Sequence, residues 1–349
     1  MTIPQRFPRR ITTALLAAAV VSCTLFSGAA AASAATDPDP GGDSASLGAA
    51  VQRIGGADRY ETAAAVSART FDPLVPIVFI ASGEVFTDAL SASAAAGAHG
   101  GAVLLTQKST LPPATATELT RLKPEQIVVL GGTATIDASV ETALHGYSGT
   151  VTRISGADRF AVSAAVSARS FASSRPVAYV ASGTVFSDAL SGSAAAGRLG
   201  GPVLLVNRDE VPTLIADELR RLAPAKIVVL GGPDTISDAA YSRLQAMAPT
   251  SRVMAADRFG VSAAVSADAF PPGIATVYVA SGSVYSDALA GSAAAIADAG
   301  PVLLVTATSV PAPVRAELDR LHPRRIVVLG GTNSISDATL ESLRGSTRP

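Results

Sequence analysis

Four short motifs recur three times along this chain of 349 residues. They are Ala-Asp-Arg-(Tyr/Phe), Ser-Gly-x-x-x-x-Asp-Ala-Leu, Val-Leu-Leu and Ile-Val-Val-Leu-Gly-Gly. The aspartates of the first motif, Asp58, Asp158 and Asp257, lie 158 − 58 = 100 and 257 − 158 = 99 residues apart, and the other motifs keep this spacing. A period of this length is the size of a domain and exceeds the roughly 20–50 residues of solenoid repeats. The sequence therefore predicts one module used three times, which suits binding to a repeating ligand better than catalysis.

Residues 1–35 have the pattern of a secretory signal peptide. Three arginines within the first ten residues precede the apolar run of residues 11–26, and Ala32-Ser33-Ala34 offers a small-x-small cleavage site. The run is short for a membrane span, which needs about 20 residues, so we expect an exported, secreted protein with no membrane span after cleavage.

The sequence before Cys23 leaves a second form of processing open. Val-Val-Ser-Cys weakly resembles a bacterial lipobox, which would make Cys23 the lipid-anchored first residue. Apolar residues continue past Cys23 and a better cleavage site follows, so ordinary signal cleavage is favoured. The polar, Pro- and Gly-rich residues 36–50 are then expected to form a flexible linker.

Charge, cysteine and histidine exclude several classes of function. Removing the signal leaves 27 − 3 = 24 Lys and Arg against 28 Asp and Glu, a net charge of −4, which argues against nucleic acid as a partner. The single cysteine lies in the signal region, so neither disulfides nor a Cys-based metal site are expected. His99, His145 and His322 occupy non-equivalent places in the three copies, which excludes a repeated metal ligand or general base. No cofactor is expected.

Each copy carries the same alternation of predicted strands and helices. In the first copy, a short strand near residues 52–54 and a helix at 59–69 precede apolar strands at 77–81, 102–106 and 127–130. Continuous apolar runs of this length are typical of parallel strands covered on both faces. The fold class predicted is α/β, with three tandem small parallel-sheet modules (Rossmann-like or Toprim-like) that have helices on both faces. The predicted copies span residues 51–149, 150–249 and 250–349.

One helix in each copy is made almost wholly of Ala, Ser and Gly. We expect it to be capped by Thr87 or Asp88 in the first copy and to extend to Ala98. Side chains this small permit very close helix packing. We therefore expect these helices to face the neighbouring modules in a compact pseudo-threefold arrangement. They are predicted at residues 88–98, 188–198 and 287–298.

Three sets of arginines repeat. The Asp-Arg pair begins a helix, and Asp58 with Glu61 fits a capping box. The arginine of this pair either holds the loop or makes bidentate contacts with an anionic ligand, and both readings stay open. A second arginine lies just upstream and would add to a local basic spot. The third, three residues after a glutamate as in Glu118 and Arg121, is interpreted as an exposed, structural helical ion pair. The candidate ligand-binding arginines are Arg53, Arg59, Arg153, Arg159, Arg252 and Arg258.

The remaining polar motifs favour structure over catalysis. Ser82-Gly83 and its equivalents follow a buried strand, where open α/β sheets bind ligands, but no recurring histidine could activate the serine. The Gly131-Gly132 turn lacks the third glycine or lysine of phosphate-binding loops, so a tight left-handed turn is predicted. With ten Phe, six Tyr and no Trp, aromatic stacking platforms are not expected, and polar contacts would dominate in binding a glycan.

Together, these motifs resemble the type 2 cell-wall-binding repeat family of bacterial surface proteins, and the resemblance covers all three copies. It implies non-covalent anchoring to an anionic cell-wall polymer (teichoic-acid-like or a secondary wall polysaccharide) through three repeats in a compact, trimer-like unit. It also implies ligand contacts in grooves between modules, near the Val-Leu-Leu segments. Carried over to this sequence, those leucines are Leu104, Leu105, Leu204, Leu205, Leu303 and Leu304.

The third copy departs from the pattern, because Ala255 stands where the others have Gly56 and Gly156, and Met254 replaces Gly55. Its first loop is therefore expected to differ, since it must avoid positive φ. We expect a non-enzymatic, exported protein of the cell surface that consists of the triplet and little else. A wall-modifying hydrolase using Ser82 and Asp88, or a structural subunit of a surface layer, remain the alternatives.

Overall fold

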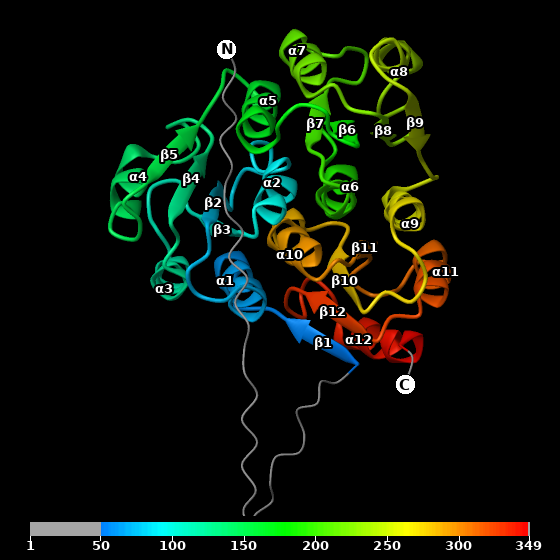
Figure 1. The fold of residues 1–349 in the computed structure, drawn as a ribbon. Coiled ribbons are helices and arrows are strands. Elements are labelled where there is room, and N and C mark those ends of the chain that lie inside the picture. Colours follow the sequence, from blue (N-terminus) through cyan, green and yellow to red (C-terminus); the bar gives the residue numbers. More distant parts are fainter. Residues whose placement is uncertain (1–49, 348–349) are drawn as a thin grey trace, which may run out of the picture. The chain divides into compact units, whose positions relative to one another are not determined.

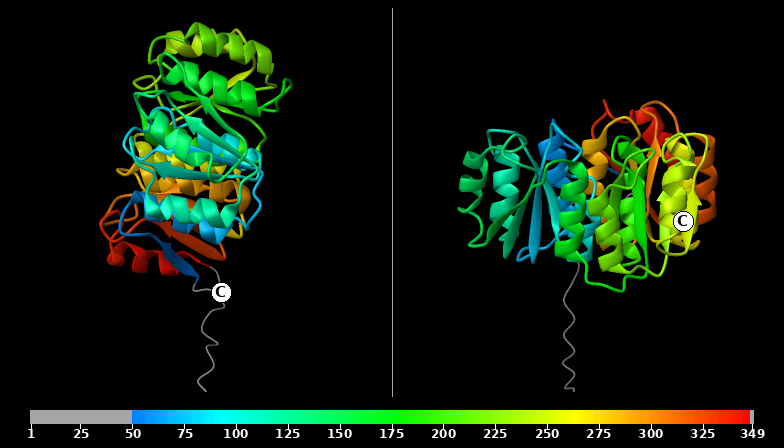
Figure 2. Two further views of the ribbon diagram at one scale, coloured as in Figure 1. Left: turned by 90° about the vertical axis from the view of Figure 1, so that its left-hand side faces the viewer. Right: turned by 90° about the horizontal axis from the view of Figure 1, so that it is seen from above.

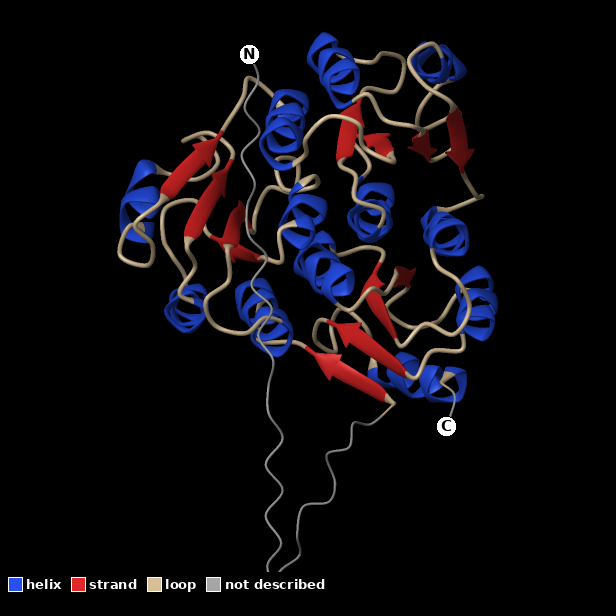
Figure 3. Ribbon diagram, viewed as in Figure 1, coloured by secondary structure: helices blue, strands red, loops and turns tan. Residues whose placement is uncertain are grey.

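The apolar runs of the first copy form strands as expected, and the other two copies repeat the pattern (Figure 3). The structure, a computed structural model, describes residues 50–347. The predicted signal peptide, Cys23 and all of the predicted linker before Ala50 lie outside the described residues. No helix within 50–347 is long and apolar enough to cross a membrane.

The three copies share one order of elements, strand and helix in alternation. The first contains β1 (Val51–Ile54), α1 (Arg59–Thr70), β2 (Ile77–Ser82), α2 (Ala92–Ala98), β3 (Ala102–Thr106), α3 (Pro113–Leu122), β4 (Gln126–Leu130) and α4 (Ala138–Leu144). The second contains β5 (Val151–Ile154), α5 (Arg159–Ser170), β6 (Ala178–Ser182), α6 (Phe186–Arg198), β7 (Val203–Val206), α7 (Thr213–Leu222), β8 (Ile227–Leu230) and α8 (Asp238–Gln245). The third contains β9 (Thr250–Val253), α9 (Arg258–Ala269), β10 (Thr276–Ser281), α10 (Tyr285–Ala297), β11 (Val302–Val305), α11 (Ala312–Leu321), β12 (Arg325–Leu329), α12 (Asp337–Leu343) and a 3-10 turn (Arg344–Ser346).

Each four-stranded parallel sheet takes its last strand from the following repeat. The strand orders are β3-β2-β4-β5, β7-β6-β8-β9 and, in the third sheet, β11-β10-β12-β1. The prediction that the strand near residues 52–54 belongs to the sheet of its own copy was wrong, because β1 pairs with β12 of the third repeat. The short connection from α4 to β5 returns the chain beside β4 by an ordinary crossover, so β5 joins the sheet of the first repeat.

The third sheet is completed by the first strand of the described chain. Val51 pairs with Ile326 and Ile54 with Leu329 in parallel register. The Ile326 amide donates to Ala50 O at 2.7 Å and the Gly330 amide to Ile54 O at 2.8 Å. The first and third repeats are therefore joined by β1, just as the peptide chain joins the other neighbours.

The small-residue helices α2, α6 and α10 pack against one another, as predicted (Figure 1). In the first repeat α4 lies on the outer side of the sheet and α2 on the inner side, and Figure 2 shows helices flanking the strands. A serine in each helix donates to a backbone carbonyl of a neighbouring repeat, which gives a cyclic set of contacts. These are Ser93 Oγ to Leu289 O at 2.8 Å, Ser193 Oγ to Leu90 O at 3.3 Å and Ser292 Oγ to Leu190 O at 3.1 Å.

Side chains fill the space where the three helices meet. Phe86, Phe186 and Tyr285 come together at the start of the helices, with ring centroids 5.4–6.1 Å apart. Near the other end, Ile296 packs against Gly97 and Gly197, where an added Cβ would lie 2.5 Å and 2.4 Å from Ile296 Cδ1. The third repeat thus supplies the large side chain at a position where the other two repeats have glycine.

Candidate functional site

Polar grooves lie between repeats, where the carboxyl ends of one sheet meet the first helix of the next repeat. The third–first groove, of about 170 Å³, contains Asp58 and Arg59 from the first repeat and Asp287 and Ser334 from the third. The second–third groove, of about 150 Å³, is built from equivalent residues. They are Asp257 and Arg258 of the third repeat with Asp188 and Thr235 of the second.

The aspartate of each Asp-Arg pair caps the helix that follows it. Asp58 Oδ1 accepts hydrogen bonds from the Tyr60 and Glu61 amides, both at 2.8 Å. Glu61 Oε2 accepts from the Ala57 amide at 2.8 Å, so the predicted capping-box pair is confirmed, with the glutamate reaching one residue further back. These bonds fix the groove edge at the start of α1.

The arginine of the pair reaches the Ser-Gly motif of its own repeat. Arg59 Nη1 donates to Gly83 O and also to Tyr285 OH, at 3.3 Å for the second bond. The two equivalents keep the contact with glycine, Arg159 Nη1 to Gly183 O at 2.5 Å and Arg258 Nη1 to Gly282 O at 2.7 Å. The guanidinium carbons of Arg59 and Arg258 each lie 5.9 Å from the centre of an aromatic ring of the neighbouring repeat. Arg59 and Arg258 therefore hold their seams as well as lining the grooves.

The glycine of the Ser-Gly motif lets the aromatic ring that follows the Asp-Arg pair pack directly against the backbone. An added Cβ on Gly83 would lie 2.5 Å from Tyr60 Cε1 and 3.0 Å from Arg59 Cδ. Gly183 and Gly282 are crowded in the same way by Phe160 and Phe259. The aromatic residue after Asp-Arg thus explains why the other motif carries glycine, a link that sequence reasoning missed.

A second aspartate connects the Asp-Ala-Leu motif with the Gly-Gly turn. An added Cβ on Gly131 or Gly330 would lie 2.6 Å from Asp88 Oδ2 or 2.2 Å from Asp287 Oδ2. Gly131 has φ of +95° and Gly330 of +94°, which confirms the tight turn. The predicted cap by Asp88 is wrong. The first helix of this set begins only at Ala92, while the two equivalent aspartates lie in the first turn of their helices and point to the turn glycine.

Burial changes the acidity of these aspartates. Asp287 is 3% exposed and Asp188 is 4% exposed. Desolvation raises the pKa of both carboxyls, against the opposing effects of a serine hydroxyl and of the arginine across the seam. Burial also raises the pKa of Asp88, which is partly exposed and accepts from Thr135 Oγ1 at 3.4 Å. Each groove therefore places a carboxyl with a raised pKa opposite an arginine.

The upstream arginines fasten the exchanged strand to its sheet. Arg53 Nη1 donates to Gly330 O at 3.0 Å, and its Nη2 lies 3.1 Å from Asp337 Oδ1. Arg153 and Arg252 make the same contact with their turn glycines, at 2.7 Å and 3.0 Å. All three side chains are at most 19% exposed. Their guanidiniums are committed to structure, so the expected basic spot is not formed by two free arginines.

The Val-Leu-Leu leucines lie inside the sheets. All six are at most 1% exposed, in the strands β3, β7 and β11. They have no surface through which a ligand could touch them, so the direct contact implied by the family resemblance is not available in this structure. Their packing supports the strands whose ends form the grooves.

The helical Glu-Arg pairs are more than surface ion pairs. Glu118 is 4% exposed and accepts from Ser67 Oγ at 2.6 Å, while Arg121 Nη2 donates to Phe71 O at 2.8 Å. The prediction of an exposed pair was wrong, because the glutamate is buried between α1 and α3. The same contacts recur around Glu218 and Glu317.

The third repeat keeps its loop through a reciprocal substitution. An added Cβ on Gly56 would lie 2.3 Å from Glu61 Cβ, and one on Gly260 would lie 2.7 Å from Ala255 Cβ. Either position can carry a Cβ, but not both. Asp257 still accepts from the Gly260 amide at 2.8 Å, so the expected change of loop does not extend to the helix cap.

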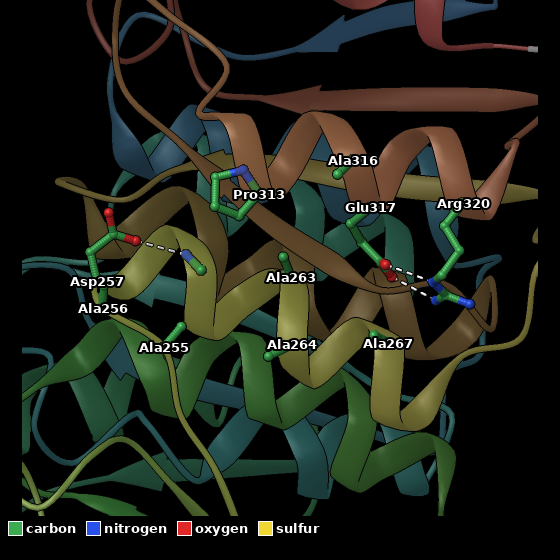
Figure 4. Close-up of a pocket in the computed structure, with 11 residues that line it drawn as sticks. Ala255, Ala256, Asp257, Ala263, Ala264, Ala267, Pro313, Ala316, Glu317 and Arg320 are labelled. Atoms are coloured by element: carbon green, nitrogen blue, oxygen red, sulfur yellow. Dashed lines mark hydrogen bonds and ion pairs between the residues drawn. The ribbon is translucent and has the colours of Figure 1, made fainter.

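A groove of about 440 Å³ lies between α9 and α11, with Ala255 and Gly260 in its lining (Figure 4). Alanines such as Ala263 and Ala264 line it, and its charged pair, Glu317 and Arg320, is already hydrogen bonded. Where this groove has Ala316, the second repeat has Asp217. The groove is lined by residues of the third repeat and is not one of the repeated polar grooves. Among residues 50–347, no cluster of three or more His, Cys, Asp or Glu could hold a metal ion.

Comparison with known proteins matches all three repeats to one family. The model described as cell wall binding domain 2 matches residues 53–141, 153–241 and 252–340. Among solved structures, Cwp6 from Clostridium difficile superposes with a TM-score of 0.80 at 25% identity, over 86% of this chain and 48% of that one. Cwp8 from the same organism gives a TM-score of 0.77 at 22% identity, over 85% of this chain and 51% of that one, a likeness of fold.

Two curated proteins of Bacillus subtilis (strain 168) are also similar. One is an amidase enhancer, 28% identical over 301 residues, which span 84% of this chain and 40% of the enhancer. The other is the N-acetylmuramoyl-L-alanine amidase LytC, 24% identical over 294 residues, which span 84% of this chain and 58% of the amidase. This chain thus spans about half the length of the curated relatives it matches.

Proposed function

Because the chain belongs to the cell wall binding domain 2 family, we propose that it is an exported, non-catalytic protein that attaches non-covalently to anionic cell-wall polymers. The observation that carries this proposal is the recurrence of one groove chemistry at two seams built from different repeats. The same side chains meeting at separate seams favour a ligand that presents the same unit repeatedly.

The groove chemistry suits a charged glycan. The Arg59 guanidinium has five N–H donors, of which only those of Nη1 have a partner among residues 50–347. Donors on Nε and Nη2 remain for a phosphate or carboxylate of the polymer. Asp287, Ser334 and Asn333 add acceptors and donors for sugar hydroxyl groups. Each groove has two aspartates for one arginine, so recognition rests on these specific contacts more than on net charge.

Linked sites would strengthen a weak individual contact. Each small groove can hold only a short stretch of polymer, and binding at one seam raises the effective concentration of neighbouring units at the next. The relatives named as an amidase and an amidase enhancer leave catalysis as the alternative. Ser82, however, is 2% exposed and its hydroxyl accepts from the Glu84 and Val85 amides, both at 3.1 Å, which favours a turn-forming role over a nucleophilic one.

The test removes the arginine from all three seams. The triple variant Arg59→Ala, Arg159→Ala and Arg258→Ala should lose about tenfold or more in affinity per occupied groove for purified cell walls, since charge-assisted hydrogen bonds contribute about 1.5–3 kcal/mol each. The matched control changes three exposed arginines in surface ion pairs, Arg208, Arg220 and Arg344, by the same substitution. A pull-down against walls measures both, with far-UV circular dichroism to verify folding.

Other outcomes distinguish the alternatives. A triple variant that folds and still binds walls like the control would refute the role of the grooves. Wild-type binding that persists on walls stripped of anionic polymers would refute the polymer class. Release of dye from labelled walls would support the hydrolase, and self-assembly without walls the surface-layer subunit.

A further inference from the structure

A second kind of seam pocket lies at the opposite, amino-terminal edge of the sheets. At the seam between the first and second repeats, the end of α2 meets the end of α5 beside the first residues of β2 and β4. The cavity there measures about 290 Å³, and we name it the amino-edge pocket. It is lined by Pro76, Ile77, His99, Gln126, Arg169 and Ser170.

The equivalent place at the third–first seam contains a carboxylate supplied by the chain itself. Asp298, which corresponds to His99, accepts from Arg325 Nη2 at 2.8 Å and from Tyr278 OH at 3.0 Å. Burial raises the pKa of the Tyr278 hydroxyl, and the nearby Asp298 carboxylate raises it further. This position of the fold therefore accommodates an anionic oxygen group between donors.

The second–third seam also carries its own acid. Asp268 stands at the position of Arg169, and Lys226 at the position of Gln126. Asp268 is close enough to contribute to the raised pKa of Tyr179. At two of the three seams, then, the chain carries an acidic side chain at this edge, and at the third–first seam that acid is paired with Arg325.

The amino-edge pocket has donors but no acidic residue in its lining. Within residues 50–347 the side chain of Arg169 has no hydrogen-bond or ion-pair partner. His99 uses Nε2 on Ser170 O at 3.1 Å, which leaves Nδ1 as a second donor when the ring is protonated. The amide of Gln126 adds a neutral donor at the same edge.

We propose that the amino-edge pocket binds a small oxyanion, a phosphate or a carboxylate, between Arg169, His99 and Gln126. The carbonyls at the ends of α2 and α5 oppose an anion, because helix C-termini carry partial negative charge. Asp298 shows that a carboxylate is accommodated at such an end when an arginine faces it. In the amino-edge pocket Arg169 supplies the positive charge, and a guanidinium can contact two oxygens of one anion at once. The site stands independently of polymer binding in the carboxyl-edge grooves.

Histidine provides a specific reporter, since the chain has only three: His99, His145 and His322. The full chain is titrated with sodium phosphate, and separately with sodium acetate, at constant ionic strength and a pH near 6, while the imidazole signals are followed by NMR. We expect the His99 signals to shift and saturate with a dissociation constant of ~1–10 mM, as a few charge-assisted bonds allow. Saturation by phosphate alone, by acetate alone or by both identifies the accepted oxyanion.

Two variants and one control make the test decisive. Arg169→Gln should weaken the anion-dependent shift about tenfold or more, whereas Arg220→Gln, an equal charge change on exposed α7, should leave it unchanged. His99→Asp copies the third repeat and should fill the pocket from within; phosphate should then no longer shift the side-chain Nε signal of Arg169. The proposal is overturned when His99 moves no more than His145 and His322, or when the shift persists in Arg169→Gln.

Discussion

Replacing Gly131 by alanine tests the contact between the Gly-Gly turn and Asp88 of the Asp-Ala-Leu motif. Gly131 has φ of +95°, and an added Cβ would lie 2.6 Å from Asp88 Oδ2 and 3.1 Å from Thr135 Cβ. The left-handed backbone costs a residue with a Cβ about 1–2 kcal/mol, and crowding in a packed site about 1–3 kcal/mol. We expect Gly131→Ala to lower the free energy of unfolding by roughly 2–5 kcal/mol.

The next residue is the matched control. Gly132 has no positive φ, and an added Cβ would meet nothing within 4 Å. Gly132→Ala should therefore leave stability unchanged or raise it by about 0.4–1 kcal/mol, because alanine restricts the unfolded chain. Urea unfolding followed by far-UV circular dichroism measures both variants. Adding Asp88→Ala to Gly131→Ala should recover the crowding part and leave the backbone part. Equal stability of the Gly131 and Gly132 variants would refute the reasoning.

Two further predictions concern the third repeat. Gly260→Ala should lower stability by about 1–3 kcal/mol, because its Cβ would lie 2.7 Å from Ala255 Cβ. Adding Ala255→Gly should restore stability by recreating the Gly-Ala pair of the second repeat. Thermal melting measures both variants, and a double variant whose stability loss is the sum of the two single losses would contradict the prediction. Burial raises the pKa of Asp287 above its ordinary value near 3.8, so the folded state holds the proton more tightly than the unfolded chain does. The free energy of unfolding of the wild type should then fall, relative to Asp287→Asn, as pH rises from about 4 to about 7. A parallel pH dependence of the two proteins in urea titrations would contradict this.

The sequence was sufficient to predict features that depend on local pattern. Apolar runs predicted the buried strands, Asp58 with Glu61 predicted a helix start, and the run of Ala, Ser and Gly predicted helices that face their neighbours. These inferences succeed because caps and periodicity act over a few residues. Because the three repeats share these patterns, each local inference predicted the same element in all three.

Contacts between distant motifs could not be predicted in this way. Nothing in the order of residues indicates that Gly83 receives the ring of Tyr60, or that Asp88 meets Gly131 instead of capping a helix. The spacing of Glu118 and Arg121 predicts an exposed ion pair on a helix, yet tertiary packing buries the glutamate. The position of Arg53 beside a turn 277 residues away depends on the exchange of strands, which local pattern does not encode.

The pairing of β1 with β12 sets a condition on how many copies such a chain can contain. Each repeat donates one strand backwards and needs one from the repeat ahead, so any row of repeats that stays open ends with a spare strand at one end and a sheet one strand short at the other. Closing the row into a circle satisfies both ends, and three is the number at which α2, α6 and α10 can all touch one another. A chain of two such copies would keep an unpaired strand and an uncovered sheet edge, the combination that promotes pairing with a second molecule.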